Sequence, residues 1–220
     1  MDHVKPARTD SNLHRDVAHR VLRIDSSARR EGSVSRQLGD EVVRRLAERN
    51  AELEVVSLDL AHGIEHIDEH WVAANFTPAE ERSSEQRRRL DASDQAVAQL
   101  QWADAVVLTA PVYNFSVPSV LKAWIDQVCR AGLSFRYTEH GPQGLIADRP
   151  VYLVMASGGV PFGSPVDFAS GYLKQVLGFI GIADVRLIGA EGVASDPNAA
   201  MSKALGVLDD CLPAAVGRVA

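Results

Sequence analysis

The sequence predicts an α/β fold in which one sheet of parallel strands carries helices on both faces. Short apolar segments alternate along the chain with longer segments whose apolar residues recur at helical spacing. The apolar segments in the middle of the chain contain few polar positions, as expected for strands that are covered on both faces. Strands that alternate with helices pair in parallel, because each helix returns the chain to the same end of the sheet.

The composition is that of an ordinary globular protein. Its 220 residues suffice for one domain, and 46% of them are hydrophobic against 24% charged. The formal net charge of −6 argues against a nucleic-acid partner. The sequence has no apolar segment of the length that spans a membrane. Two distant cysteines, Cys129 and Cys211, form no disulfide framework and fit a cytoplasmic protein.

The predicted domain occupies residues 21–220. Residues 1–20 mix Arg, His, Asp and Lys without an apolar core, so we expect a mobile tail and no secretory signal there. The short apolar segment Val21–Asp25 is the first predicted strand. A helix is expected from Ser33 onward, where apolar residues take helical spacing, and Leu53–Leu58 is the second predicted strand.

The next segment, Asp59–Phe76, is long and polar and is expected to be a loop. A helix is predicted to begin at Thr77 and to run to about Trp102. Thr77 can cap the first free amides, Pro78 suits the first helical position, and Glu80 can close a capping box.

The central part of the chain supplies the most apolar strand, Asp104–Ala110. A helix is predicted over Pro118–Ala131, with Gly132 as its terminator. The Gly-rich segment Phe135–Leu145 is expected to be a loop or a hairpin.

The last third of the chain completes the alternation. Val151–Ala156 and Asp184–Ile188 are the fourth and fifth predicted strands. The segment Ser164–Asp167 resembles the start of a helix by the same capping argument, and Pro197–Leu212 is the predicted closing helix.

Ligands of parallel sheets bind at the carboxyl ends of the strands, so the loops after Asp25, Ala110 and Ala156 are of most interest. The first loop places four serine hydroxyls at a helix N-terminus, where free amides and the helix dipole attract a phosphate. It has neither the G-x-G-x-x-G pattern of a dinucleotide site nor the lysine of an NTPase loop. On this loop alone, a simple helix cap by Ser33 or Ser35 explains the serines equally well.

The second loop, Pro111–Pro118, holds two aromatic residues and Asn114 between prolines, which suits the stacking of a flat ring. The third loop contains Gly158 and Gly159, which let the backbone approach a ligand closely. Each loop alone could be an ordinary turn. Together they predict a site for a phosphorylated planar ring, and FMN fits better than NAD because only one phosphate cradle is present.

Several longer motifs closely resemble the FMN-dependent NADH azoreductase family, whose members are also described as NADH:quinone oxidoreductases. The similarity extends over most of the domain, from Val21 to Leu212. The matching segments are Pro111–Phe115, Pro118, Leu121-Lys122, Asp126, Arg130–Gly132, Phe135–Thr138, Gly141–Leu145, Leu177–Ile182 and Glu191-Gly192.

The resemblance implies a flavodoxin-like doubly wound sheet of strand order 2-1-3-4-5 and a homodimer with active sites at its interface. It also implies ping-pong hydride transfer from NADH or NADPH through FMN to quinones and azo compounds. From the residues themselves, we expect no catalytic acid–base side chain and no metal. The family's FMN contacts correspond to Ser27, Ser33, Val34, Ser35, Val112, Tyr113, Asn114, Phe115, Ala156, Ser157, Gly158 and Gly159.

The chain departs from the family pattern at two places. Val112 stands where the family often has Met, and Ala156-Ser157 stands where it often has Ser-Arg. The loss of that arginine removes a charged donor near the flavin or the incoming substrate. We therefore expect a changed preference for acceptor or nucleotide.

Other functions remain open from the residues. A flavodoxin-like electron carrier, a flavin reductase that releases reduced FMN and a regulatory protein with a degenerate site could share this fold. Three histidines, His62, His66 and His70, recur every fourth residue and could chelate a metal on one helix. Gly63 between them favours a polar loop near the site entrance.

Overall fold

The computed structural model describes residues 18–214; residues 1–17, most of the expected N-terminal tail, and 215–220 lie outside the described residues. Its main sheet has five parallel strands in the order β2-β1-β3-β6-β7, which confirms the expected order 2-1-3-4-5. The strands are β1 (Arg20–Asp25), β2 (Glu54–Asp59), β3 (Ala105–Pro111), β6 (Val151–Ser157) and β7 (Val185–Glu191).

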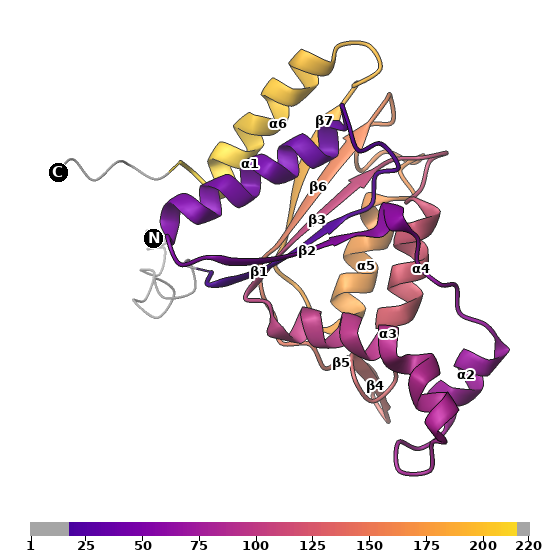
Figure 1. Cartoon of the computed structure of the whole chain (residues 1–220). Coiled ribbons are helices and arrows are strands. Elements are labelled where there is room, and N and C mark those ends of the chain that lie inside the picture. Colours follow the sequence, from indigo (N-terminus) through magenta and orange to yellow (C-terminus); the bar gives the residue numbers. More distant parts are fainter. Residues whose placement is uncertain (1–17, 215–220) are drawn as a thin grey trace, which may run out of the picture.

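Helices cover both faces of this sheet (Figure 1). Two of them, α1 (Val34–Arg49) and α6 (Pro197–Cys211), share one hydrophobic cluster on one face. Helices α3 (Ser84–Trp102), α4 (Ser119–Val128) and α5 (Ser170–Ile180) contribute to a larger cluster on the other.

The side chains of β3 show how one strand serves both clusters. Ala105 and Val107 belong to the cluster with α1 and α6, whereas Val106 and Leu108 belong to the cluster with α3, α4 and α5. Successive side chains of a strand point to opposite faces, so a strand with two covered faces must be apolar at every position. This is the physical reason for the uninterrupted apolar segment in the sequence.

The predicted helix start at Thr77 is wrong. The helix α3 begins at Ser84, and its capping box is formed by Ser83 and Gln86. Thr77 instead ends a short helix, α2 (Glu69–Phe76), inside the segment that was expected to be a loop. Helix α2 forms because the Asp68 carboxylate caps its first turn and because its Trp71 is buried.

The predicted helix start at Ser164 is also wrong. The amide of Ser164 donates to the carbonyl of Pro161 in a turn, and α5 begins at Ser170. The side chain that supports this helix start is that of Asp167, which accepts hydrogen bonds from the amides of Ala169 and Ser170.

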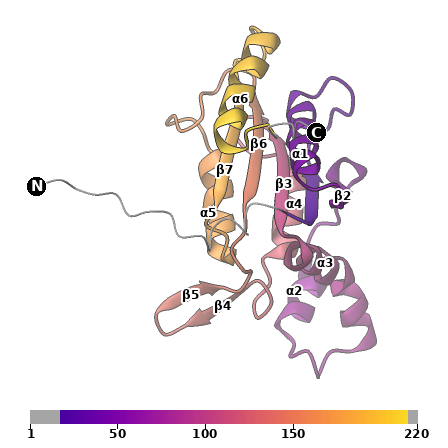
Figure 2. The same cartoon turned by 90° about the vertical axis from the view of Figure 1, so that its left-hand side faces the viewer.

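The segment after α4 forms the hairpin that the sequence left as one of two alternatives. Strands β4 (Phe135–Thr138) and β5 (Gly141–Gly144) pair in antiparallel fashion. The hairpin projects from the end of the molecule that also carries α2 (Figure 2). A single 3-10 turn, η2 (Leu60–His62), follows β2. Within 18–214, no helix combines the length and the apolarity needed to cross a membrane.

The sheet brings the three loops of interest together. Asp25, the last residue of β1, lies opposite Asp59 of β2 on one side and Thr109 of β3 on the other. Pro111 at the end of β3 lies opposite Ala156 of β6. The loops that follow β1, β3 and β6 therefore leave the sheet side by side at its carboxyl edge.

Candidate functional site

The loop between β1 and α1 leads into the first turn of α1. The serine at the N-cap position does not cap this turn with its side chain. Ser33 occupies the N-cap position, but its side chain forms no capping hydrogen bond. Its hydroxyl lies instead 3.3 Å from the hydroxyl of Ser35, and both side chains are buried. The first amides of a helix have no partner within the helix. With two hydroxyls beside them, the amides at Val34 and Ser35 have the donor chemistry that holds a phosphate.

Ser27 connects the first loop to the second. Its buried hydroxyl accepts a hydrogen bond from the amide of Arg29 at 3.2 Å and lies 3.5 Å from the phenol oxygen of Tyr113. The neighbouring Ser26 donates its hydroxyl to the carbonyl of Thr109 at 2.7 Å. Both serines therefore fix the start of the loop against β3 and the segment that follows it.

A partly buried pair of charged residues, Arg36 and Asp59, supports this loop, and the sequence analysis missed it. Arg36 donates to the backbone carbonyl of Ser27 at 2.8 Å and to both carboxylate oxygens of Asp59 at 3.2 and 2.7 Å. The hydrogen bond from Arg36, together with the amide of Ala61, lowers the pKa of Asp59 although partial burial opposes this. The Nε atom of Arg36 is buried without a hydrogen-bond partner in the structure.

The second loop contains a strained turn. Asn114 and Phe115 both have positive φ angles, of 49° and 70°. Tyr113 and Ser116 exchange two backbone hydrogen bonds of 2.9 and 3.0 Å around them, as in a two-residue hairpin turn. Left-handed backbone costs about 1–2 kcal/mol for a residue such as Phe. Strained backbone of this kind is common at functional sites. At this turn, the ring of Phe115 is 56% exposed.

The third loop exposes backbone at its two glycines. A side chain at Gly159 would have no heavy atom within 4 Å, and one at Gly158 would meet only Ala194 at 3.6 Å. Neither glycine has a left-handed φ, so neither the fold nor the backbone conformation there demands glycine. The space that a Cβ would fill is the space in which a ligand can approach the backbone.

Ser157 occupies the position where the family often has arginine, and its side chain points inward. It is 1% exposed, and its hydroxyl accepts a hydrogen bond from the amide of Val160 at 2.8 Å. The side chain therefore organises the third loop. The half-buried Ala156 accepts a hydrogen bond from the amide of Val112 at 2.8 Å, which ties the second loop to the third.

The three loops thus form one surface. Ser27 meets Tyr113, Val112 meets Ala156, and the amide of Phe168 donates to the carbonyl of Phe115 at 3.2 Å. Phe168 is 60% exposed and adds a second accessible ring near the turn at Phe115. Ten of the twelve residues predicted from the sequence lie in these loops or in the first turn of α1, and the other two, Ala156 and Ser157, are the last residues of β6, directly before the third loop.

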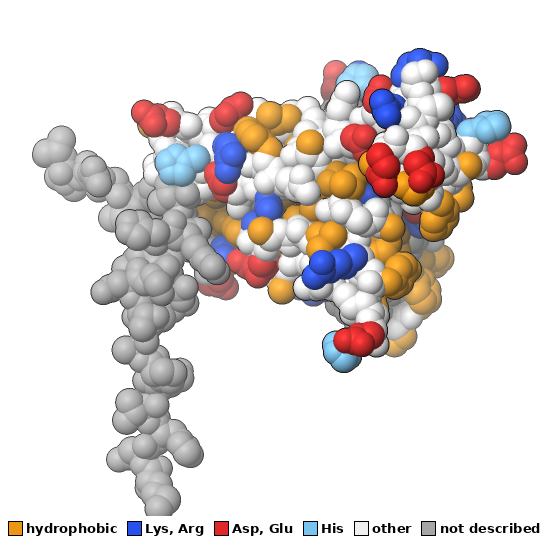
Figure 3. Space-filling model, turned by 90° about the horizontal axis from the view of Figure 1, so that it is seen from below, with side chains coloured by type: hydrophobic (Ala, Val, Ile, Leu, Met, Phe, Trp, Pro, Cys, Tyr) orange, Lys and Arg blue, Asp and Glu red, His pale blue; other side chains and the backbone are white. Residues whose placement is uncertain are grey.

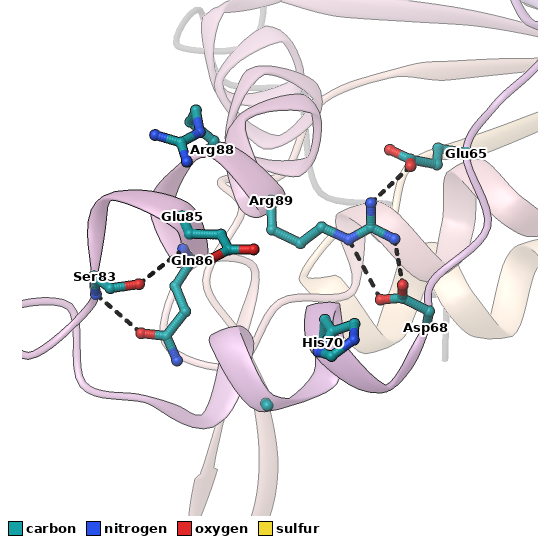
Figure 4. Close-up of a pocket in the computed structure, with 9 residues that line it drawn as sticks. Glu65, Asp68, His70, Ser83, Glu85, Gln86, Arg88 and Arg89 are labelled. Atoms are coloured by element: carbon teal, nitrogen blue, oxygen red, sulfur yellow. Dashed lines mark hydrogen bonds and ion pairs between the residues drawn. The ribbon is translucent and has the colours of Figure 1, made fainter.

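A separate pocket of about 620 Å³ lies between α2 and the start of α3. Most of the residues that line it are polar or charged, and Figure 4 shows Arg89 bound to both Glu65 and Asp68. The lining residues are Glu65, Asp68, His70, Ala73, Ser83, Glu85, Gln86, Arg88 and Arg89. None of them belongs to the three loops, so this pocket is distinct from the candidate site.

The three histidines do not share a helix. His62 ends η2, His66 lies in the following loop and His70 lies in α2. Among residues 18–214, no group of three or more His, Cys, Asp or Glu side chains is placed to hold a metal ion.

Comparison with known proteins shows to which family the chain belongs. A family model described as a flavodoxin-like fold matches residues 19–210. An FMN-dependent NADH:quinone oxidoreductase of Jannaschia sp. is 49% identical over 180 residues, which are 82% of this chain and 92% of the relative. The chain belongs to this flavodoxin-like family. A second relative, an FMN-dependent NADH:quinone oxidoreductase of Hahella chejuensis, is 46% identical over 84% of this chain and 91% of its own length.

A solved structure has a similar architecture. It is an FMN-dependent NADH-azoreductase of Bacillus anthracis in complex with FMN. It is 25% identical, covers 88% of this chain and 97% of its own, and superimposes with a TM-score of 0.78. The expected fold and the expected family resemblance are therefore confirmed.

Proposed function

We propose that this chain is an FMN-dependent NADH:quinone oxidoreductase that also reduces azo compounds. The observation that carries the proposal is the convergence of three loops at the carboxyl edge of the sheet, around the strained turn at Asn114 and Phe115. Relatives that are 46% and 49% identical carry the name FMN-dependent NADH:quinone oxidoreductase.

The residues present fit FMN. The uncapped start of α1, with Ser33, Val34 and Ser35, suits the phosphate. The turn around Asn114 suits the ring, because it presents an aromatic side chain, an amide side chain and backbone amides on a rigid support. The remaining contacts fall to Ser27, Val112, Tyr113, Phe115, Ala156, Ser157, Gly158 and Gly159.

FMN, when bound, supplies the chemistry by accepting a hydride from the nicotinamide and passing it to the acceptor. The protein's own residues bind, orient and cover the ring. The hydroxyl of Ser27 lies 3.5 Å from the phenol oxygen of Tyr113, and this contact brings the first and second loops together. We assign no side chain as a general acid or base.

The proposed kinetics are ping-pong, with NADH or NADPH and the acceptor using one position in turn. The basis is a single phosphate cradle and the absence of a separate dinucleotide-binding motif from the sequence. Double-reciprocal plots with menadione should give parallel lines. Intersecting lines, which indicate a ternary complex, would contradict this part of the proposal.

The proposed assembly is a cytoplasmic homodimer without nucleic-acid or membrane partners. Large apolar side chains are exposed beside the candidate site and on the hairpin, among them Phe115, Tyr137 and Phe168. Figure 3 shows hydrophobic side chains at the surface on the face seen from below. Light scattering should give twice the mass of the 23.8 kDa chain, and a fully active monomer would refute this assembly.

Catalytic turnover separates the proposed enzyme from the other functions on this fold. The purified protein should consume NADH continuously with menadione and no other protein present, whereas an electron carrier would need a partner. FMN should remain with the protein through gel filtration, whereas a flavin reductase that releases its product would lose it. Azo dyes should react more slowly than quinones, because their cleavage needs twice as many electrons.

A further inference from the structure

Arg36 is a largely buried cation at a position that is unfavourable for positive charge. It is the third residue of α1, and its side chain is only 12% exposed. The N-terminus of a helix carries partial positive charge, so a cation in the first turn is normally destabilising. Burial without partners would add a further cost. The surroundings of Arg36 must therefore compensate for both.

Two carboxylates provide that compensation. Asp25 and Asp59 are directly opposite each other on β1 and β2. Arg36 lies 3.6 Å from Asp25 and binds Asp59 through two hydrogen bonds. Asp25 also accepts hydrogen bonds from Thr109 at 2.7 Å and from Arg23 at 2.8 Å.

The charge balance of this group bears on the neighbouring loop. Arg23 and Arg36 face three carboxylates, since Arg23 also pairs with Asp40. Asp25 and Asp59 end strands β1 and β2, next to the β1–α1 loop that is proposed to hold a dianionic phosphate. Without Arg36, these carboxylates would lack its positive charge. Like charges repel each other more in a partly buried site than in water, because screening by solvent and salt is weaker there.

We propose that Arg36 is a positioning residue for the flavin phosphate: it fixes the β1–α1 loop through the Ser27 carbonyl and screens the phosphate from Asp25 and Asp59. This inference rests on the proposed function. It assigns to Arg36 an effect on the phosphate end of the ligand and little effect on the ring. FMN and riboflavin, which differ only in the phosphate, are therefore the appropriate pair of probes.

The test is a fluorescence titration of the flavin-free protein with FMN and with riboflavin at low ionic strength. Arg36→Met should weaken FMN about ten- to a hundredfold, the range for lost interactions with a charged group. Riboflavin affinity should change less than threefold. Arg36→Lys should keep part of the FMN affinity, because it restores the charge without the fork of donors.

The carboxylate of Asp59 supplies a second, independent variant. Asp59→Asn keeps the shape and the hydrogen-bonding oxygen that receives the Ala61 amide, but removes one negative charge. In the wild-type background it also removes one hydrogen bond that holds Arg36, so the Arg36→Met background is the one in which the charge effect is measured. In the Arg36→Met background it should recover part of the lost FMN affinity. Arg44→Met is the matched control, because Arg44 lies on the same helix but is half-exposed and paired with Glu41 and Glu48.

The outcomes are distinct. A purely structural role for Arg36 predicts that Arg36→Met weakens FMN and riboflavin equally and that Asp59→Asn recovers nothing; either result overturns the inference. If Arg36→Met does not fold, Arg36→Lys takes its place, and an equal loss of FMN and riboflavin affinity in Arg36→Lys overturns the inference as well. A wild-type protein that binds neither flavin would instead refute the proposed function.

Discussion

The third loop offers a test in which protein stability and ligand binding should change in opposite directions. In Gly159→Ala, the new methyl group meets no heavy atom within 4 Å, and the backbone is outside the left-handed region. Gly-to-Ala changes at such positions stabilise a protein by about 0.4–1 kcal/mol, because the unfolded chain loses freedom. For a domain of this size, the melting temperature should rise by about 1–4 °C.

FMN affinity should fall in the same variant. If the open space at Gly159 is where the flavin approaches the backbone, the methyl group occupies it. Overpacking of this kind costs about 1–3 kcal/mol, which corresponds to a roughly five- to hundredfold weaker FMN complex. The larger Gly159→Leu should weaken FMN further while the flavin-free protein stays folded.

The assays are thermal unfolding of the flavin-free protein and fluorescence titration with FMN. The matched control is Gly206→Ala in α6, where a new Cβ also has open space and helix propensity gains about 0.5–1 kcal/mol. That variant should be stabilised to a similar extent with unchanged FMN affinity. If Gly159→Leu binds FMN as tightly as the wild type, the third loop does not contact the flavin and this reasoning is refuted.

Three further predictions follow from single contacts. Replacing both Ser33 and Ser35 with Ala should weaken FMN binding by about a hundredfold or more in a fluorescence titration, because each lost hydroxyl hydrogen bond to a charged group contributes about 1.5–3 kcal/mol. Unchanged FMN affinity would show that the two serines do not bind the phosphate. Gly144→Ala should lower the free energy of unfolding, measured in urea, by about 3 kcal/mol. The reason is that the new Cβ would lie 2.2 Å from the backbone nitrogen of Gly181. A variant as stable as the wild type would show that the backbone shifts there without cost. Burial raises the pKa of Asp167, but hydrogen bonds from the Ser170 hydroxyl and three amides outweigh it, and the net pKa is lowered. Its contribution to stability should therefore be complete above the unfolded-state pKa, near 4, and be lost as the pH falls through the lower folded value; the stability difference between Asp167→Asn and the wild type should shrink below pH 4, and a constant difference would contradict this.

The sequence predicted the sheet and the loops well because their signals are local. Apolar strands and helical spacing are visible in short windows, and the aromatic turn at Tyr113–Phe115 directly follows the strand that positions it. The resemblance supplied the strand order, and the structure confirms it.

The errors arose where several local signals competed. Thr77 and Ser83 both precede a residue that can close a capping box, and only tertiary contacts decide between them. Trp71 of α2 donates its Nε1 to the Gln127 side chain of α4 at 3.0 Å, a contact between residues far apart in sequence. That contact stabilises α2, which ends at Thr77. Thr77 is therefore the end of one helix, and α3 begins later, at Ser84.

The role of Arg36 could not be predicted from the sequence. Its partners Asp25 and Asp59 lie at the ends of two different strands, and they meet only when β1 and β2 pair in register. The one available signal was a cation in the first turn of a helix, where the helix dipole disfavours it. Similarly, the inward orientation of Ser157 depends on the turn that brings the Val160 amide to its hydroxyl.

The most direct test of the account is an anaerobic absorbance experiment on the purified protein with added FMN. We expect one FMN to bind per chain, its visible absorbance to bleach on addition of NADH or NADPH, and the absorbance to return when menadione is added without any other protein. A protein that retains no FMN after gel filtration, or whose bound FMN is not bleached by either nucleotide, would contradict the proposed function.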